Sequence, residues 1–354
     1  MCSKLKILIL PLYGLGDTLM MTPALQILKE QNKLFQIDVL TLSKTNYEIL
    51  KNNPYIDNLL FFPFLQKGKL KSLIYFAKHF SFKYDIVINF FPSNRKEYNI
   101  LSFLTFARKR IGHKYLHYNF KELNFLKNLT VSEDDNLHNV EENINLLRFL
   151  EIKEVKTVPN LQIFLTQDEE AFGNDFLKKY TESGDITIGI HPGCSKFKNH
   201  NRKRLPIYKW VKIVNHYGNY KFFVFGTDEE KEELEEIRRK AKFKNVEVIR
   251  NTDIRKVAAI IKRLNLFLSN DSGLMHLAAA VKTPVIAVFG PTNPVWVKPW
   301  KVKHEIIRRE ELNCIPCFVY SPKPLSCKYG DFRCLNELDE NKIIEKIGEF
   351  INYE

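Results

Sequence analysis

Five short polar motifs in the sequence follow apolar runs and contain residue types that could take part in chemistry. They are Tyr13-Gly-Leu-Gly-Asp17, His191-Pro-Gly-Cys-Ser195, Gly226-Thr-Asp-Glu-Glu230, Asn270-Asp-Ser-Gly273 and Gly290-Pro-Thr-Asn293. Apolar runs rich in Ile, Val and Leu are typical of strands in a parallel sheet covered on both faces. Ligands of such sheets bind beyond the carboxyl ends of the strands. The motifs together therefore predict ligand-binding sheet edges.

The first motif places a carboxylate in a glycine-rich turn. Gly14 and Gly16 allow the backbone to approach a ligand closely, and Thr22-Pro23 is typical of a helix start with Thr22 as N-cap. The spacing G-x-G-D fits neither the dinucleotide fingerprint nor a P-loop. Asp17 would repel a pyrophosphate but suits a general base facing an acceptor hydroxyl. The residues alone favour a simpler role for Asp17 as a helix cap.

A basic segment follows the second motif. Residues 192–204 include no acidic residue and five basic ones, namely Lys196, Lys198, Arg202, Lys203 and Arg204. Backbone amides at a strand end, together with a Lys, make a phosphate site. A solvated basic loop is the alternative, but its place at the predicted ligand edge favours phosphate contact.

The motif around Asp271 opens a predicted helix at another strand end. Backbone amides at a helix N-terminus favour a bound phosphate, so this turn is a second candidate phosphate site. Asp271 could cap the helix, and Ser272 could donate a hydrogen bond to a ligand oxygen. His276, one turn further on, is more simply explained as a side chain packed against the sheet than as a catalytic group.

Residues 228–236 contain seven acidic residues and one Lys. Most of this run is explained by a solvated helix face, since acidic residues are favoured in a first turn. The acid nearest the strand end, Glu229 or Glu230, could instead accept hydrogen bonds from a ribose diol, as acids do in other doubly wound folds.

Four cysteines near the C-terminus have the spacing C-x2-C-x9-C-x6-C; they are Cys314, Cys317, Cys327 and Cys334. One half of this pattern matches a zinc knuckle and the other half does not. Unpaired or locally packed thiols are therefore favoured over a structural zinc site. No Asp has another Asp two residues on, so the D-x-D pair that holds a divalent metal in many nucleotide-sugar enzymes is missing.

Strands alternate with helices along both halves of the chain. The predicted strands are 5–10, 36–41 and 84–90 in the first half, and 186–191, 222–225, 246–249, 266–269 and 285–289 in the second. The predicted helices are 23–31, 70–79, 96–107 and 140–150, then 206–217, 229–242, 254–263, 273–281 and 341–351. This pattern predicts two doubly wound α/β domains facing each other across a central cleft.

An irregular stretch at residues 155–167, which includes Pro159, marks the expected domain boundary. We expect an N-terminal Rossmann-like domain at 1–165. A second Rossmann-like domain at 166–335 would carry the cysteine-rich tail. The remaining residues, 336–354, form a helix that could pack back on the N-terminal domain.

Composition narrows the class of partner. The chain has 354 residues, of which 54 are Lys or Arg and 41 are Asp or Glu, so its net charge is +13. Such a surface favours anionic partners: nucleotides, phosphorylated lipids, an acidic membrane face or nucleic acid. No apolar run approaches the roughly 18 residues of a membrane helix. The short N-terminal run contains Pro11 and precedes no small-residue cleavage site, so we expect a first strand and a cytoplasmic location.

Taken together, the motifs resemble glycosyltransferase family 9, the bacterial heptosyltransferases of lipopolysaccharide core assembly. Residues 10–25 resemble the family's opening motif, and residues 84–89, with Arg95 and residues 110–112, are similar to its first-domain pattern. Residues 191–193 and 203–206 resemble its donor-phosphate loop. Residues 270–276 and 289–294 resemble its second-domain signature. The matches run in the expected order from residue 5 to about 300.

This resemblance implies a GT-B fold and an inverting, metal-independent transfer that uses no cofactor. It also implies that the domain at 1–165 binds the acceptor and that the domain at 166–335 binds a nucleotide-sugar. It places Asp17 at the catalytic base, so the interpretation of this residue shifts from cap to base. Gly14, Gly16 and Arg95 fall on the acceptor side. The positions implied for the donor are Ser195, Lys203, Glu230, Asp271, Ser272, Gly273 and His276, with Lys203 as the phosphate-contacting residue. Leu205 departs from the pattern, since the family often has Trp there.

The function we expect from the resemblance is transfer of a heptose from ADP-heptose to a phosphorylated glycolipid of the lipopolysaccharide inner core. The acceptor would be met at the inner face of the inner membrane, with peripheral contact there. One alternative keeps fold and mechanism but uses another nucleotide-sugar or surface glycan. The other, a basic nucleic-acid-binding protein, is less favoured: core packing explains the aromatic residues, and no nucleic-acid module is recognised.

Overall fold

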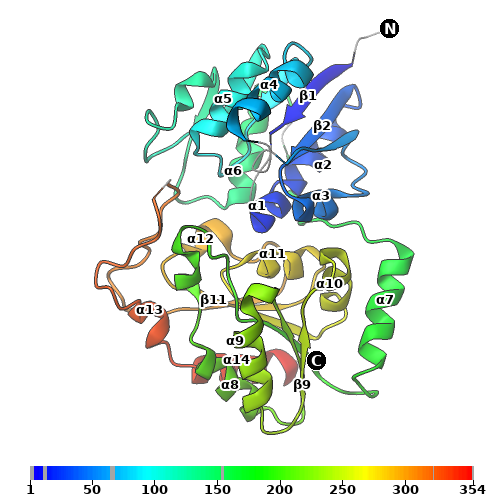
Figure 1. Cartoon of the computed structure of the whole chain (residues 1–354), viewed down its shortest axis with the longest axis vertical. Helices are drawn as coiled ribbons and strands as arrows, with labels where there is room; N and C mark the ends of the chain where they lie inside the picture. The colour runs from blue at the N-terminus through cyan, green and yellow to red at the C-terminus, as the bar shows by residue number, and fades with distance from the viewer. Residues whose placement is uncertain (1–3, 11–13, 64–67, 153–154, 322, 353–354) are drawn as a thin grey trace. The chain divides into compact units, whose positions relative to one another are not determined.

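The computed structural model describes residues 4–10, 14–63, 68–152, 155–321 and 323–352. The chain divides into two compact units, and Figure 1 labels many of their helices and some of their strands. The N-terminal unit comprises Met1–Phe164 and Val319–Pro322, and the C-terminal unit comprises Leu165–Phe318 and Lys323–Glu354. Residues 319–321 of the cysteine-rich tail therefore belong to the N-terminal unit, so the expectation that the whole tail lies in the C-terminal domain is corrected.

All strands of the N-terminal sheet are parallel and follow the order β3-β2-β1-β4-β5-β6. This is the order of the doubly wound nucleotide-binding fold, in which the winding reverses between β1 and β4. The strands are β1 (Leu5–Ile9), β2 (Phe35–Thr41), β3 (Asn58–Phe61), β4 (Ile86–Ile88), β5 (Lys109–Lys114) and β6 (Leu129–Ser132).

Apolar side chains cover both faces of this sheet, because successive residues of a strand point to opposite faces. Ile7 and Ile9 of β1 lie in one buried cluster, and Leu8 lies in another with Phe76 and Phe80. Burial on both faces explains the nearly continuous apolar runs in the sequence. The helical elements of the unit are α1 (Leu15–Met20), α2 (Thr22–Gln31), α3 (Lys44–Leu50), α4 (Lys69–Phe80), α5 (Lys96–Leu104), η2 (Asn124–Leu126), α6 (Asn139–Asn145) and η3 (Leu146–Leu150).

The C-terminal sheet repeats the same winding, with its parallel strands in the order β12-β11-β10-β7-β8-β9. Its strands are β7 (Thr187–His191), β8 (Lys221–Phe225), β9 (Val246–Ile249), β10 (Leu266–Asn270), β11 (Val285–Val288) and β12 (His304–Ile307). Here the winding reverses between β7 and β10. The predicted class, α/β with two doubly wound Rossmann-like sheets, is confirmed.

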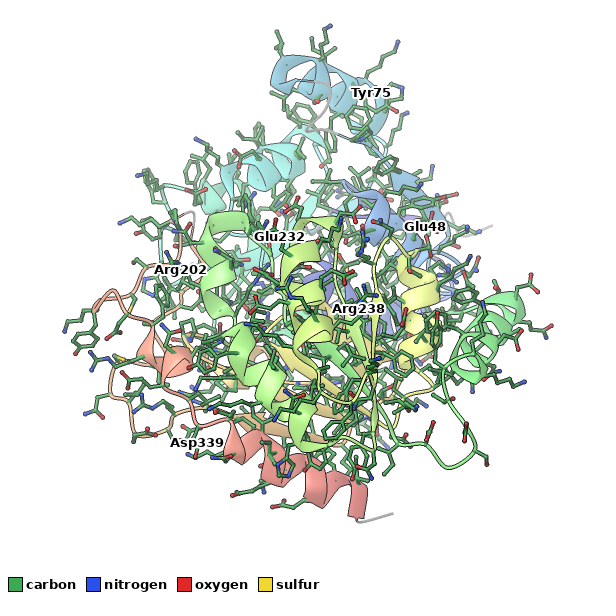
Figure 2. The ribbon with its side chains drawn as sticks, turned by 60° about the horizontal axis from the view of Figure 1, so that its bottom comes forward. Glu48, Tyr75, Arg202, Glu232, Arg238 and Asp339 are labelled. Carbon is green, nitrogen blue, oxygen red and sulfur yellow. The ribbon has the colours of Figure 1, made fainter. Side chains whose placement is uncertain are left out.

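The helical elements of the C-terminal unit are α7 (Gln167–Lys178), η4 (Phe197–Lys203), α8 (Ile207–His216), η5 (Asp228–Glu230), α9 (Lys231–Lys240), α10 (Ile254–Ile261), α11 (Gly273–Ala280), α12 (Pro294–Val297), α13 (Arg333–Asn336) and α14 (Asn341–Asn352). The acidic run ends in α9, which buries Leu234 and Ile237 and leaves Glu232 and Arg238 exposed (Figure 2). None of the described helices combines the length and apolar character that crossing a membrane requires.

The last helix, α14, belongs to the C-terminal unit, and the expectation that it packs back on the N-terminal domain is wrong. Ile343 and Ile347 lie one turn apart on α14, and both are fully buried in the core beneath α8, β11 and β12. The Tyr217 hydroxyl donates a hydrogen bond of 2.6 Å to the carbonyl oxygen of Ile344. The amphipathic face of α14 is therefore covered by the unit that directly precedes it in sequence.

Candidate functional site

In the C-terminal unit, the loops that follow β7 and β10 are joined at the point where the winding reverses. The side-chain amide of Asn270, at the end of β10, donates to the carbonyl oxygens of Pro192 at 2.6 Å and Gly193 at 3.3 Å. Its carbonyl oxygen accepts from the backbone N–H of Leu205 at 2.9 Å. One fully buried side chain thus holds the second and fourth motifs against the end of the basic segment.

Lys203, the predicted phosphate contact, lies in this junction. Its Nζ is 2.9 Å from Oδ2 of Asp271, and the Thr292 hydroxyl donates to the same oxygen at 2.7 Å. Lys203 and Asp271 are both largely buried. Burial alone would raise the pKa of Asp271, but the charge of Lys203 and the hydrogen bond from Thr292 outweigh it and keep that pKa below its ordinary value. The predicted role of Asp271 as N-cap of α11 is wrong.

Ser272 occupies the N-cap position of α11, with Gly273 as the first helical residue. The Ser272 hydroxyl does not cap the helix, because it lies 2.8 Å from Nδ1 of His191 and 3.0 Å from the Ser269 hydroxyl. The one proton of Ser269 is directed at the carbonyl oxygen of Asn270, 2.7 Å away. Ser272 therefore donates to Ser269, and the Nδ1–H of His191 donates to Ser272.

His191 was quoted in the second motif but not predicted as a site residue. Burial lowers its pKa to about 4, so the imidazole is neutral at pH 7. The signal that could have found it is its position: it is the last residue of β7, at the winding reversal. His276 on α11 is also buried, its pKa is lowered to about 4 by burial, and its Nδ1 has no hydrogen-bond partner among the described residues.

These two histidines make the stability of the chain depend on pH. Both pKa values are lower in the folded chain, at about 4, than the ordinary 6.5, so the unfolded chain binds more protons between these values. We expect the free energy of unfolding to fall as the pH drops from 6.5 towards 4, by up to about 3 kcal/mol per histidine. The free energy of unfolding, measured with denaturant across this pH range, should fall less steeply with falling pH in His276→Gln than in the wild type. The same pH dependence in both would contradict the lowered pKa of His276.

Of the two acidic residues considered for a ribose diol, Glu229 is exposed and Glu230 is buried. Glu230 Oε1 accepts from the Arg204 guanidinium at 2.8 Å, and its Oε2 accepts from the backbone N–H of Thr227 at 3.0 Å. A Cβ atom on Gly193 would lie 2.0 Å from Glu230 Oε1 and 2.8 Å from His191 Nε2, so only glycine fits at this position. The carboxylate thus lies directly on the loop that follows β7.

Most of the basic segment forms the 3-10 helix η4, which two residues with non-helical backbone angles interrupt. Lys198 and Asn199 have φ values of 52° and 62°, in the left-handed region. Ser195, before the helix, is exposed, and its hydroxyl accepts from the backbone N–H of Phe197 at 3.1 Å. The structure therefore pairs Lys203 with Asp271, directly before Ser272 and Gly273 at the start of α11, whereas Ser195 contacts its own loop.

In the N-terminal unit, Asp17 lies in the first turn of α1, and Gly14 is the N-cap. A Cβ atom on Gly14 would lie 2.4 Å from Oδ2 of Asp17, so the carboxylate rests on the glycine backbone. The prediction that Thr22 caps the helix is wrong. A short helix precedes it, and the Thr22 hydroxyl donates to the carbonyl oxygen of Leu19 at 2.7 Å.

The turn that follows β4 contains Arg95, which is the N-cap residue of α5 and is half-buried. The backbone N–H of Ser93 in this turn donates to the buried hydroxyl of Tyr115 at 2.5 Å. Burial raises the pKa of Tyr115 well above its ordinary value, against the hydrogen bond from Ser93. The negative charges of Glu133, Glu142 and, least, Asp17 add to the rise. Asp17 is thus within electrostatic range of the Tyr115 hydroxyl that holds the Arg95 turn.

The four tail cysteines carry free thiols. Cys334 is buried and Cys317 is exposed. Across the part of the chain that the structure describes, no three or more His, Cys, Asp or Glu side chains are arranged to hold a metal ion.

Comparison with known proteins shows that the chain matches one protein family. The model of "Glycosyltransferase family 9 (heptosyltransferase)" matches residues 76–326, which is more than half of the chain. The chain belongs to glycosyltransferase family 9. This confirms the resemblance found in the sequence, and the family match includes the basic segment and the Asn270–His276 turn.

One curated relative is lipooligosaccharide heptosyltransferase 2 of Campylobacter jejuni, which is 28% identical over 171 residues, 47% of this chain and 52% of the relative. The chain spans about half the length of the first relatives it matches. The fold is shared with a family 9 glycosyltransferase from Veillonella parvula, with a TM-score of 0.81, 21% identity and coverage of 100% and 99% of the two chains. It is shared as well with E. coli ADP-heptose lps heptosyltransferase II, with a TM-score of 0.74, 18% identity and 99% coverage of each chain.

Proposed function

We propose that this chain is an inverting, metal-independent glycosyltransferase that moves a heptose from ADP-heptose to an acceptor of the lipopolysaccharide inner core. The observation that carries the proposal is the junction of Lys203, Asp271 and the N-terminus of α11 at the winding reversal of the C-terminal sheet. Membership of family 9 supports the reaction class. Relatives named as heptosyltransferases, and a structural neighbour named for ADP-heptose, support the sugar and the donor.

The C-terminal unit would bind the donor diphosphate. The first backbone N–H groups of α11 have no partner within the helix and carry partial positive charge, so they favour an anion. Lys203 would add a full positive charge beside them as negative charge grows on the leaving diphosphate. In the structure this charge is paired with Asp271, so donor binding exchanges that ion pair for a contact with phosphate.

Glu230 and His191 would bind the nucleoside part of the donor. Glu230 Oε1 and His191 Nε2 both lie within 3 Å of the position that a Cβ atom on Gly193 would occupy. Because the proton of the neutral His191 ring is on Nδ1, its Nε2 is a hydrogen-bond acceptor. Two neighbouring acceptors suit a pair of hydroxyl donors such as the ribose diol.

The N-terminal unit would supply the base. Asp17 takes the proton of the acceptor hydroxyl while the hydroxyl oxygen attacks the anomeric carbon of the sugar. The new carbon–oxygen bond forms as the bond between the anomeric carbon and the diphosphate oxygen breaks, and ADP leaves with the electron pair. Attack on the face opposite the nucleotide inverts the configuration at the anomeric carbon.

The acceptor we propose is a phosphorylated glycolipid at the inner membrane face, met by peripheral contact from the cytoplasmic side. The net charge of +13 supports this choice, because the acceptor and the lipid surface around it are anionic. Half-buried Arg95 in the turn after β4 would pair with acceptor phosphate or carboxylate groups. Nucleic acid is not part of the proposal.

A panel of nucleotide-sugars tests the donor. A ligand present at 100 times its dissociation constant stabilises the folded chain by about 2.7 kcal/mol, which is measured readily as a rise in melting temperature. We expect a selective rise with ADP-heptose. A selective rise with another nucleotide-sugar would keep the reaction class and replace the sugar. No rise with any nucleotide-sugar, with and without acceptor present, would contradict the proposed function.

A further inference from the structure

Phe318, in the cysteine-rich tail, covers the ammonium group of Lys203. The Lys203 Nζ lies 4.0 Å from the centre of the Phe318 ring, well within the range of a cation–π contact. The His200 ring meets the Phe318 ring edge-on, with centres 5.5 Å apart and an interplanar angle of 80°. Burial lowers the pKa of His200 to about 4, so this neighbour is neutral at pH 7 and does not compete for the ring as a cation.

The backbone fixes Phe318 in this position. The N–H groups of Cys317 and Phe318 both donate to the carbonyl oxygen of Pro291, at 2.9 and 3.0 Å. Pro291 precedes Thr292, whose hydroxyl donates to Asp271. The turn that follows β11 therefore contacts both partners of Lys203. The Thr292 side chain bonds the Asp271 carboxylate, and the Pro291 carbonyl oxygen bonds the backbone of Phe318.

The tail also holds the interrupted part of the basic segment. The backbone N–H of Leu325 donates to the carbonyl oxygen of Lys198 at 2.8 Å, and the Asn199 amide donates to the carbonyl oxygen of Leu325 at 3.3 Å. These bonds fall on the two residues with left-handed φ, a conformation that non-glycine residues rarely adopt. The guanidinium carbon of Arg202, labelled in Figure 2, lies 5.5 Å from the centre of the Phe332 ring.

We propose that the tail is a clamp on the basic segment, with Phe318 as a positioning residue that holds Lys203 ready for the donor diphosphate. Here the clamp means residues 317–318, 325 and 332, which make the contacts described above. The inference rests on the proposed function, in which Lys203 contacts that diphosphate. It gives the cysteine-rich tail a role that needs no metal.

The chemistry of the ring suits this role. Asp271 and a phosphate are both anions, so they compete for the Lys203 ammonium. An aromatic ring carries no net charge, and it attracts the ammonium while leaving the N–H groups on its far side available to an anion. The ring also excludes water from a side chain that is only 6% exposed, which strengthens the attraction between Lys203 and a phosphate.

Binding of ADP and of adenosine to the full chain, measured by calorimetry, tests the clamp. Phe318→Leu removes the π face and keeps an apolar side chain, and we expect it to weaken ADP binding roughly 5- to 30-fold. Adenosine lacks the diphosphate, so its affinity should stay the same. Phe318→Tyr should bind ADP like the wild type. Tyr329→Leu is a matched control, since Tyr329 is an exposed aromatic residue of the same tail that stacks on Arg333, and it should change neither affinity.

A combination with Lys203→Met separates positioning from a general structural effect. If Phe318 acts through Lys203, Phe318→Leu should weaken ADP binding no further once Lys203 is replaced. An unchanged ADP affinity in Phe318→Leu, an equal loss for adenosine, or a full loss on top of Lys203→Met would each overturn the clamp and leave the proposed function standing. Phe318→Met gives the same test if the Leu variant does not fold. A wild-type chain that binds no ADP would contradict the proposed function, and the clamp with it.

Discussion

Replacement of Asp17 by Asn is expected to lower the rate of sugar transfer by about 100- to 10,000-fold and to leave donor binding unchanged. Asn has the shape of Asp but cannot accept the proton of the attacking hydroxyl. The variant should fold normally, because Asp17 lies half-buried in the first turn of a six-residue helix and Asn keeps its packing on Gly14. Donor binding should persist because the proposed donor site is built entirely from the C-terminal unit.

The matched control is Asp85→Asn. Asp85 precedes β4, at the amino end of the same sheet, where its carboxylate accepts from the backbone N–H of Lys6 at 2.9 Å. Ligands bind at the opposite, carboxyl edge of such a sheet, so this variant should keep its turnover. Near wild-type turnover in Asp17→Asn, with donor binding intact, would show that Asp17 is not the base and that the mechanism is wrong.

Replacement of Lys203 by Met should weaken ADP binding by about 2–5 kcal/mol, because one charged partner of the diphosphate is lost. It should also lower the free energy of unfolding, by up to about 3–5 kcal/mol, because the largely buried Asp271 loses its counter-ion. The hydrogen bond from Thr292 remains and reduces this second loss. Calorimetry with ADP and denaturant unfolding measure the two effects separately.

The double variant Lys203→Met with Asp271→Asn tells the two effects apart. It removes the buried charge as well as its partner, so stability should return in part while ADP binding stays weak. Lys196→Met serves as the control, since Lys196 is a half-exposed cation of the same segment whose ion pair with Glu229 contributes about 1 kcal/mol or less. Wild-type ADP affinity in Lys203→Met would remove the basis for placing the diphosphate at this junction.

Hydrophobic patterning predicted the central strands well, because β1, β7 and β10 are buried on both faces and read as apolar runs. Strands that are less apolar were not predicted. β5 begins with Lys109-Arg110, and the edge strand β12 is only partly buried. Helix α7 was missed although its signal is present. Thr166 and Glu169 form a capping box in which each side chain accepts from the other's backbone N–H.

The candidate site was predictable as a place but not as a set of partners. Strand ends with Gly and polar residues indicated where ligands bind, and the structure brings the second and fourth motifs together there. The roles of single residues depend on neighbours far away in sequence. A local pattern indicates Asp271 as a helix cap, whereas its actual partner, Lys203, is 68 residues away. The contact of Phe318 with Lys203 likewise joins segments that no local pattern relates.

Sugar transfer to an acceptor glycolipid, followed by mass spectrometry, tests the central claim most directly. The chain is incubated with ADP-heptose, a chelator and a phosphorylated inner-core glycolipid. We predict that the glycolipid gains one heptose, that one ADP is released per heptose, and that Asp17→Asn slows the gain by about 100- to 10,000-fold. A chain that binds ADP-heptose but adds no sugar to any inner-core glycolipid, or an Asp17→Asn variant that transfers heptose as fast as the wild type, would contradict the account.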